Sequence, residues 1–111
     1  MKRDYKLYIK DILESIKQLR EYTNGTSEEQ FTKDKKLQDA VIRRIEIIGE
    51  AIRNIPGALK VKNKNIPWFE LAQFRDLIVH SYFEASIKRI WKIATKDIPN
   101  LKENFENIKL I

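Results

Sequence analysis

The stretch FRDLIVHSYF, residues 74 to 83, brings together residue types that could do chemistry. It contains the single histidine of the chain, His80, with Arg75 five positions before it and Tyr82 two positions after it. An imidazole can move a proton near neutral pH, and a guanidinium can bind a phosphate through two parallel donors. On an ideal helix Arg75 and His80 lie ~140° apart, so they would flank a groove and could hold a phosphate from two sides.

Asp76 adds a carboxylate one helical turn before His80. The two residues stand at positions i and i+4 of one helix face, where the carboxylate could accept a hydrogen bond from the imidazole and orient it. A base, a cation and a hydroxyl suffice to cleave RNA without a metal, because the 2′-hydroxyl of the substrate is the nucleophile. The alternative is structural: a single histidine at a helix end often caps the helix or packs against it.

Composition limits the classes of protein and the kinds of site. The chain has 111 residues and a mass of 13.2 kDa, which fits one domain spanning residues 1–111. It has no cysteine and one histidine, so we expect no disulfide, no metal centre and no cofactor. A net charge of +6 and a pI near 9.6 favour a polyanionic partner, of which nucleic acid is the commonest. Without an apolar leader or membrane span in the sequence, we expect a cytoplasmic location and no membrane contact.

Apolar residues recur at three- and four-residue steps, which predicts helices and no strands. We expect long helices over residues 7–22 and 37–55, a third that begins at Pro67, and a fourth capped by Ser86. Gly25 would end the first helix, and Thr26 or Ser27 would cap the next. Residues 60–67 read as a polar loop. Pro99 should break or kink the fourth helix, after which helix would continue to the C-terminus. The fold class predicted is all-α, an antiparallel four-helix up-and-down bundle with an additional C-terminal helical segment.

The motif and its surroundings resemble one known family. The run from Arg75 to Tyr82 is similar to the Arg-X4-His-X-Tyr motif of HepT-like proteins in the HEPN superfamily. RRIEIIGEAIRNIP (43–56) resembles their second-helix signature, and IPWFELAQFRD (66–76) resembles the start of their third helix. Trp91 and IPNLKENF (98–105) fit the fourth helix and its tail, so the resemblance spans essentially the whole chain. The residue after the motif arginine is often asparagine in the family and is Asp76 here.

The resemblance implies a HEPN-like ribonuclease toxin that forms a homodimer, in which the motifs of two protomers share a cleft. Arg75 and His80 would be the catalytic pair, with Asp76 orienting His80. The implied partners are an RNA substrate and a minimal nucleotidyltransferase antitoxin, which would add AMP to Tyr82 and could join the dimer in a larger hetero-oligomer. A second hypothesis stays open: a non-catalytic nucleotide-binding or partner-binding subunit of a nucleotidyltransferase complex.

Overall fold

Helices make up all the regular secondary structure in the part of the chain that the structure describes. The structure is a computed structural model, and it describes residues 3–79 and 84–111, apart from the side chains at positions 75, 78, 79, 84 and 85. The elements in chain order are α1 (Tyr5–Thr23), α2 (Glu28–Lys33), α3 (Lys35–Arg53), α4 (Gly57–Lys62), α5 (Trp68–Val79), α6 (Glu84–Lys92), a π-helical turn η1 (Ile93–Asp97), a 3-10 turn η2 (Pro99–Leu101) and α7 (Lys102–Glu106). The predicted all-α fold is confirmed.

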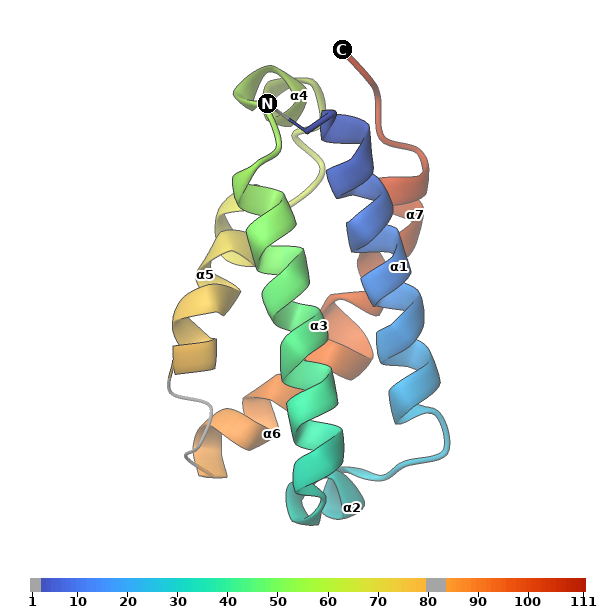
Figure 1. The fold of residues 1–111 in the computed structure, drawn as a ribbon, viewed down its shortest axis with the longest axis vertical. Helices are drawn as coiled ribbons and strands as arrows, with labels where there is room; N and C mark the ends of the chain where they lie inside the picture. Colours follow the sequence, from blue (N-terminus) through green and yellow to red (C-terminus); the bar gives the residue numbers. More distant parts are fainter. Residues whose placement is uncertain (1–2, 80–83) are drawn as a thin grey trace.

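Consecutive long helices run in alternating directions, as Figure 1 shows. α1 and α3 lie side by side, and α5 packs against α3. α6 and η1 form an oblique segment that packs on α2 at one end and reaches α1 at the other. The up-and-down arrangement is therefore more elaborate than four helices, because α2 and α4 stand between the long helices, and α4 extends into residues 60–67, which the sequence predicted as a loop.

The core is formed by the apolar faces that the sequence predicted. Ile12, Ile16 and Leu19 of α1 belong to one buried cluster with Ile45 of α3. Each side chain of this size contributes roughly 1.5–3 kcal/mol when it leaves water. Because the buried residues recur every three or four positions, one face of each helix turns inward and the other carries the charges.

The turn between α1 and α3 contains a short helix with its own caps. Gly25, at φ 76°, follows the end of α1 in the left-handed conformation that glycine adopts easily. Ser27 caps α2: its hydroxyl accepts from the Gln30 backbone N–H at 3.1 Å, and the Gln30 side chain accepts from the Ser27 backbone N–H at 2.9 Å. Asp34 then caps α3 through the Leu37 backbone N–H. Ser27 is thus an N-cap as predicted, although of a six-residue helix.

Two boundaries differ from those predicted, and the break at Pro99 is confirmed. α6 begins at Glu84, so Ser86 lies inside the helix and does not cap it. Pro99 does disturb the fourth helix, and the chain widens into η1 just before it, where the Ile98 N–H bonds to the Ile93 carbonyl at 2.9 Å. A proline crowds the carbonyl four residues earlier, and an i to i−5 turn relieves that clash. Helix ends at Glu106, and residues 107–111 do not continue it.

The C-terminal segment is held by a buried amide. Asn63, at the end of α4, donates through Nδ2 to the carbonyl of Leu59 at 2.8 Å and to the carbonyl of Lys109 at 2.9 Å. Its Oδ1 accepts from the Lys109 N–H at 2.7 Å. A side chain thus takes the role of backbone pairing for this segment, which explains why residues 107–111 leave the helical path. The segment 60–67, predicted as a polar loop, is therefore part helix and part buried anchor.

Replacing Asn63 by alanine is expected to lower the free energy of unfolding by about 2–3 kcal/mol. Three side-chain hydrogen bonds disappear, and the Lys109 groups lose their partner in a partly buried position. Urea denaturation followed by circular dichroism measures the change. Asn65→Ala is the matched control, because Asn65 is exposed and should shift stability by less than about 0.5 kcal/mol. Equal effects of the two substitutions would contradict the anchoring role.

Candidate functional site

α5 carries the first half of the predicted site, because Arg75 and Asp76 both lie in it. Pro67 stands just before the helix, and its carbonyl accepts the Leu71 N–H at 3.0 Å to close the first turn. A proline fits this boundary since it needs no hydrogen-bond acceptor and its φ suits a helix start. The predicted helix start at Pro67 is therefore early by one residue.

Packing at the N-terminal half of α5 fixes the helix in the bundle. Trp68 Nε1 donates to the Asn63 carbonyl at 2.9 Å, and the indole meets the ring of Phe105 edge-on at a centroid distance of 5.8 Å. Leu71 is buried and Phe74 packs against the core. Asp76, in contrast, is exposed. α5 is thus a well-anchored support that presents Asp76 to solvent one turn before the helix ends.

The structure places some of the predicted site residues and not others. Arg75 and Asp76 lie on consecutive positions of α5, as the sequence predicted, but only the backbone of Arg75 is described. His80 and Tyr82 lie outside the described residues. The pairing of Asp76 with His80 and the groove between Arg75 and His80 therefore stay predictions.

The aromatic residues near the motif differ in exposure. Trp68 and Phe74 are half-buried and pack against the core of their own chain. Phe83 lies outside the described residues. The exposed aromatic on α5 is Phe69, whose side chain is 75% accessible. Phe69 and Asp76 are seven positions apart, so they share one exposed face of the helix.

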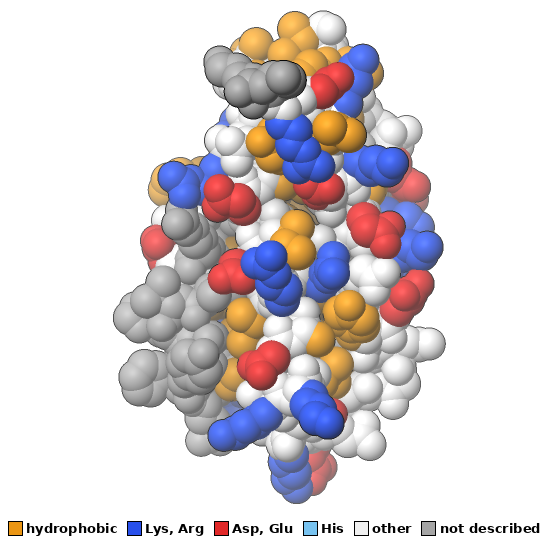
Figure 2. All heavy atoms as spheres, in the orientation of Figure 1, with side chains coloured by type: hydrophobic (Ala, Val, Ile, Leu, Met, Phe, Trp, Pro, Cys, Tyr) orange, Lys and Arg blue, Asp and Glu red, His pale blue; other side chains and the backbone are white. Residues whose placement is uncertain are grey.

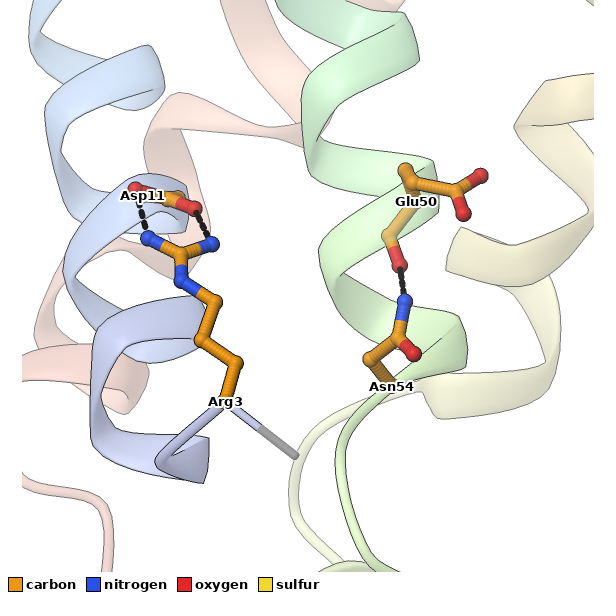
Figure 3. A network of polar contacts seen from close by, with 4 residues as sticks. All are labelled: Arg3, Asp11, Glu50 and Asn54. Carbon is orange, nitrogen blue, oxygen red and sulfur yellow. Dashed lines mark hydrogen bonds and ion pairs between the residues drawn. The ribbon is translucent and has the colours of Figure 1, made fainter. Parts of the chain in front are cut away.

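A hollow of about 400 Å³ lies between α1 and α3, but its charges neutralise one another. Arg3 forms a two-pronged contact with Asp11 at 2.6 and 3.4 Å, as Figure 3 shows. The hydrogen bonds that Arg3 donates to the Asp11 carboxylate raise the pKa of Arg3 above its ordinary value. Arg43 pairs with Glu46 at 3.0 Å. Figure 2 shows the same alternation of acidic and basic side chains over this face, so the hollow offers no excess positive charge to a ligand.

A second group of cations lies on α6 and η1, directly after the motif in sequence. Lys88, Lys92 and Lys96 line one hollow together with Trp91. In the sequence alone these lysines are typical of an ordinary solvated helix face. Their spacing of four residues was visible in the sequence, but their common hollow depends on the packing of α6 against α2.

The described residues contain neither a metal-binding cluster nor a membrane-spanning helix. No group of three or more Asp and Glu side chains within the described ranges is arranged to hold a metal ion. Among the same residues, no helix is both long enough and apolar enough to cross a membrane.

Known proteins similar to this chain point to one family. The family model described as "Ribonuclease HepT-like" matches residues 12–108. The chain is 48% identical over 108 residues to the "Gamma-glutamylcyclotransferase and putative RNase" of Methanocaldococcus jannaschii. The aligned region covers 97% of this chain and 49% of that protein. The chain is 46% identical over 109 residues to the "Probable ribonuclease HepT" of Thermococcus cleftensis. That aligned region covers 98% of this chain and 99% of that protein. The chain thus spans about half of the first relative and nearly all of the second. No solved structure is significantly similar to it.

Proposed function

The chain belongs to the HepT-like ribonuclease family, and from this premise we propose that it is a metal-independent endoribonuclease, the toxin of a two-gene toxin–antitoxin system. Membership of this family supports a ribonuclease function. The proposal of a metal-independent endoribonuclease toxin rests on the Arg75-X4-His80-X-Tyr82 motif. This motif begins on α5 and lies within the residues that the family model matches.

The motif supplies the parts that RNA cleavage by transesterification needs. His80 removes the proton of the 2′-hydroxyl or delivers a proton to the leaving 5′-oxygen. The 2′-oxygen bonds to phosphorus as the bond from phosphorus to the 5′-oxygen breaks, which leaves a 2′,3′-cyclic phosphate and a 5′-hydroxyl. Arg75 stabilises the negative charge that develops on the phosphoryl oxygens. Asp76 orients the imidazole of His80.

Cleavage in the presence of EDTA tests this function. The purified chain should cut RNA with EDTA present, and the fragments should end in cyclic phosphate and 5′-hydroxyl groups. Products with 5′-phosphates, or cleavage that requires added metal, would contradict the mechanism. RNA binding without cleavage would favour a non-catalytic binding subunit.

The proposed homodimer uses the exposed face of α5. A face that carries Phe69 and leads to Asp76 would bring two copies of the motif together across a two-fold axis. Exposed aromatic residues are enriched at the centres of such contacts. The cations of the two copies would then act on one RNA strand.

Phe69→Lys is expected to shift the protein from about twice 13.2 kDa to 13.2 kDa in light scattering at micromolar concentration. A lysine at the centre of an apolar contact places one charge from each copy near the axis, and the charges repel. Val61→Lys is the matched control, because Val61 is 66% exposed on α4 and lies outside the proposed face. A wild-type chain that is monomeric, or a Phe69→Lys dimer, would count against this contact.

Arg75 is expected to act by geometry as well as by charge. Arg75→Ala should lower the cleavage rate about 10²–10³-fold, the usual effect of removing one donor to a developing oxyanion. Arg75→Lys should restore little of that rate, because an ammonium cannot make the planar two-donor contact with a phosphate. Single-turnover cleavage measures both rates. A fully active lysine variant would show that Arg75 supplies only diffuse charge.

A further inference from the structure

A hollow between α6, η1 and the start of α2 has the composition of a site for nucleic acid. Its volume is about 580 Å³, and its wall is formed mainly by Lys88, Lys92 and Lys96, with Arg89 beside them. Among the residues whose side chains the structure describes, Glu28 of α2 is the one carboxylate in this wall. Within that described set, four cations therefore face the same space with one acidic group to oppose them.

Other hollows in the described part of the chain do not share this excess. The hollow between α1 and α7 also has four cations, but Glu14, Glu21 and Glu106 lie among them. The hollow between α1 and α3 has two arginines and three carboxylates. A field of one sign over a concave surface raises the local concentration of an oppositely charged ligand, whereas mixed charges cancel at short range. Among these hollows, the surface on α6 is the one that favours a polyanion.

The indole of Trp91 lines the hollow and packs against an aromatic ring of α2. Trp91 is half-buried, and its ring lies 5.1 Å from the ring of Phe31, which is itself fully buried on α2. The Thr95 hydroxyl donates to the Trp91 carbonyl at 2.7 Å and closes the turn above the indole. Aromatic rings beside cations are typical of surfaces that bind single strands, since bases stack on the ring while phosphates meet the charges.

The π-helical turn keeps the lysines on one side of the helix. Residues in an α-helix advance 100° each, so Lys88, Lys92 and Lys96 would drift around an ideal helix. The wider turn from Ile93 to Asp97 reduces this drift before Lys96. The three lysines then extend over about 12 Å at the usual rise per residue, a length suited to successive phosphates of an extended strand.

We propose that this hollow, called the α6 hollow here, binds the single-stranded RNA segment next to the cleaved phosphate. The inference rests on the proposed function, because α6 begins four residues after His80 and so continues directly from the motif. Phosphates would contact the lysines and one base would lie against Trp91. The preference for a single strand follows from the indole, since the bases of an A-form duplex are stacked inside and unavailable to it.

Salt-dependent binding tests the proposal. The probe is a fluorescein-labelled 20-nucleotide RNA of mixed sequence without secondary structure, with the full-length His80→Ala chain to keep the RNA intact. Removing the three lysines as Lys88→Gln/Lys92→Gln/Lys96→Gln should lower the slope of log affinity against log salt by about 2, since each contact with a single strand contributes about 0.7. Affinity at 0.1 M salt should fall roughly 10- to 100-fold.

The matched control is Lys10→Gln/Lys17→Gln/Lys102→Gln, which removes the same charge from the hollow between α1 and α7. This variant should change the slope by less than half as much. Equal changes in both variants would show that the lysines act only through net charge and would overturn the proposal. An unchanged slope in the α6 variant would also overturn it and would assign the α6 hollow to another partner, such as an acidic protein.

Cleavage by variants that retain His80 separates this inference from the proposed function. If the wild-type chain cleaves RNA and the α6 variant cleaves it equally well at 0.15 M salt, the α6 hollow is not part of the substrate path although the function stands. If the wild-type chain binds RNA through the α6 hollow without cutting it, the ribonuclease proposal fails while the binding surface stands.

Discussion

His80→Ala is expected to lower the rate of RNA cleavage by about 10²–10⁴-fold, the range over which a positioned acid or base accelerates a proton-transfer step. The chain has one histidine, so no second imidazole can take over the role. Single-turnover cleavage in EDTA, with protein in excess over RNA, isolates the chemical step from binding. We expect RNA affinity to remain within about threefold of wild type, since the lysines and arginines available for phosphate contacts are unchanged.

A pH profile separates proton transfer from a structural role of His80. For the wild-type chain, the profile of cleavage rate against pH should show a midpoint that belongs to the imidazole. The residual activity of His80→Ala should lack that midpoint. A variant that keeps the same profile at full rate, or one whose circular dichroism shows loss of helix, would instead indicate that His80 caps or supports α5.

The longest helices could be predicted from the sequence because their burial pattern is periodic. Ile12, Ile16 and Leu19 repeat over several turns of α1, and α3 does the same over its full length. α2 and α4 were not predicted, because six residues give fewer than two turns and no measurable period. For α2 the cap was more informative than the apolar residues, because Thr26 or Ser27 was predicted to cap a helix and Ser27 does so.

Long-range contacts explain the boundaries that the sequence did not predict. The tail at 107–111 carries apolar residues with helical spacing, but Asn63 captures the Lys109 backbone from 46 positions away. Nothing in the local sequence near Lys109 reports that competitor. Ser86 is a good N-cap by residue type, yet α6 has already begun at Glu84. Propensity is a weak guide wherever tertiary contacts decide where a helix begins or ends.

Part of the candidate site could be predicted from the sequence, and part depends on the fold. Residue types and spacing predicted Arg75, Asp76, His80 and Tyr82 as a unit, and the fold adds that Asp76 is exposed on an anchored helix. The cations of the α6 hollow could not be separated from an ordinary solvated face in sequence. Their meaning depends on how few carboxylates among the described side chains lie opposite them, Glu28 being the one in the wall, and only the packing of α2 on α6 reveals this.

Addition of AMP to Tyr82 is expected to abolish cleavage, because the modification places new charge where the substrate phosphate must bind. Each AMP unit adds a bulky group and about one negative charge two residues from His80. Steric exclusion and repulsion would act together, and Arg75 could pair with the attached phosphate in place of RNA. Under this proposal a nucleotidyltransferase antitoxin performs the transfer: the tyrosine oxygen bonds to the α-phosphorus of ATP, and pyrophosphate leaves with the proton lost to solvent.

Co-expression with a minimal nucleotidyltransferase encoded beside this chain tests the switch, with intact and peptide masses as the readout. One or more AMP units should appear on the peptide that contains Tyr82, and the modified chain should cleave RNA at least 10²-fold more slowly than the unmodified chain. Tyr82→Phe keeps the ring and removes the acceptor oxygen, so it should cleave RNA normally and escape neutralisation. Tyr22→Phe is the matched control, because Tyr22 is a half-buried tyrosine on α1 whose loss should leave modification intact. Neutralisation that persists unchanged in Tyr82→Phe would show that the antitoxin acts by binding alone, and Tyr82 would then be a packing residue.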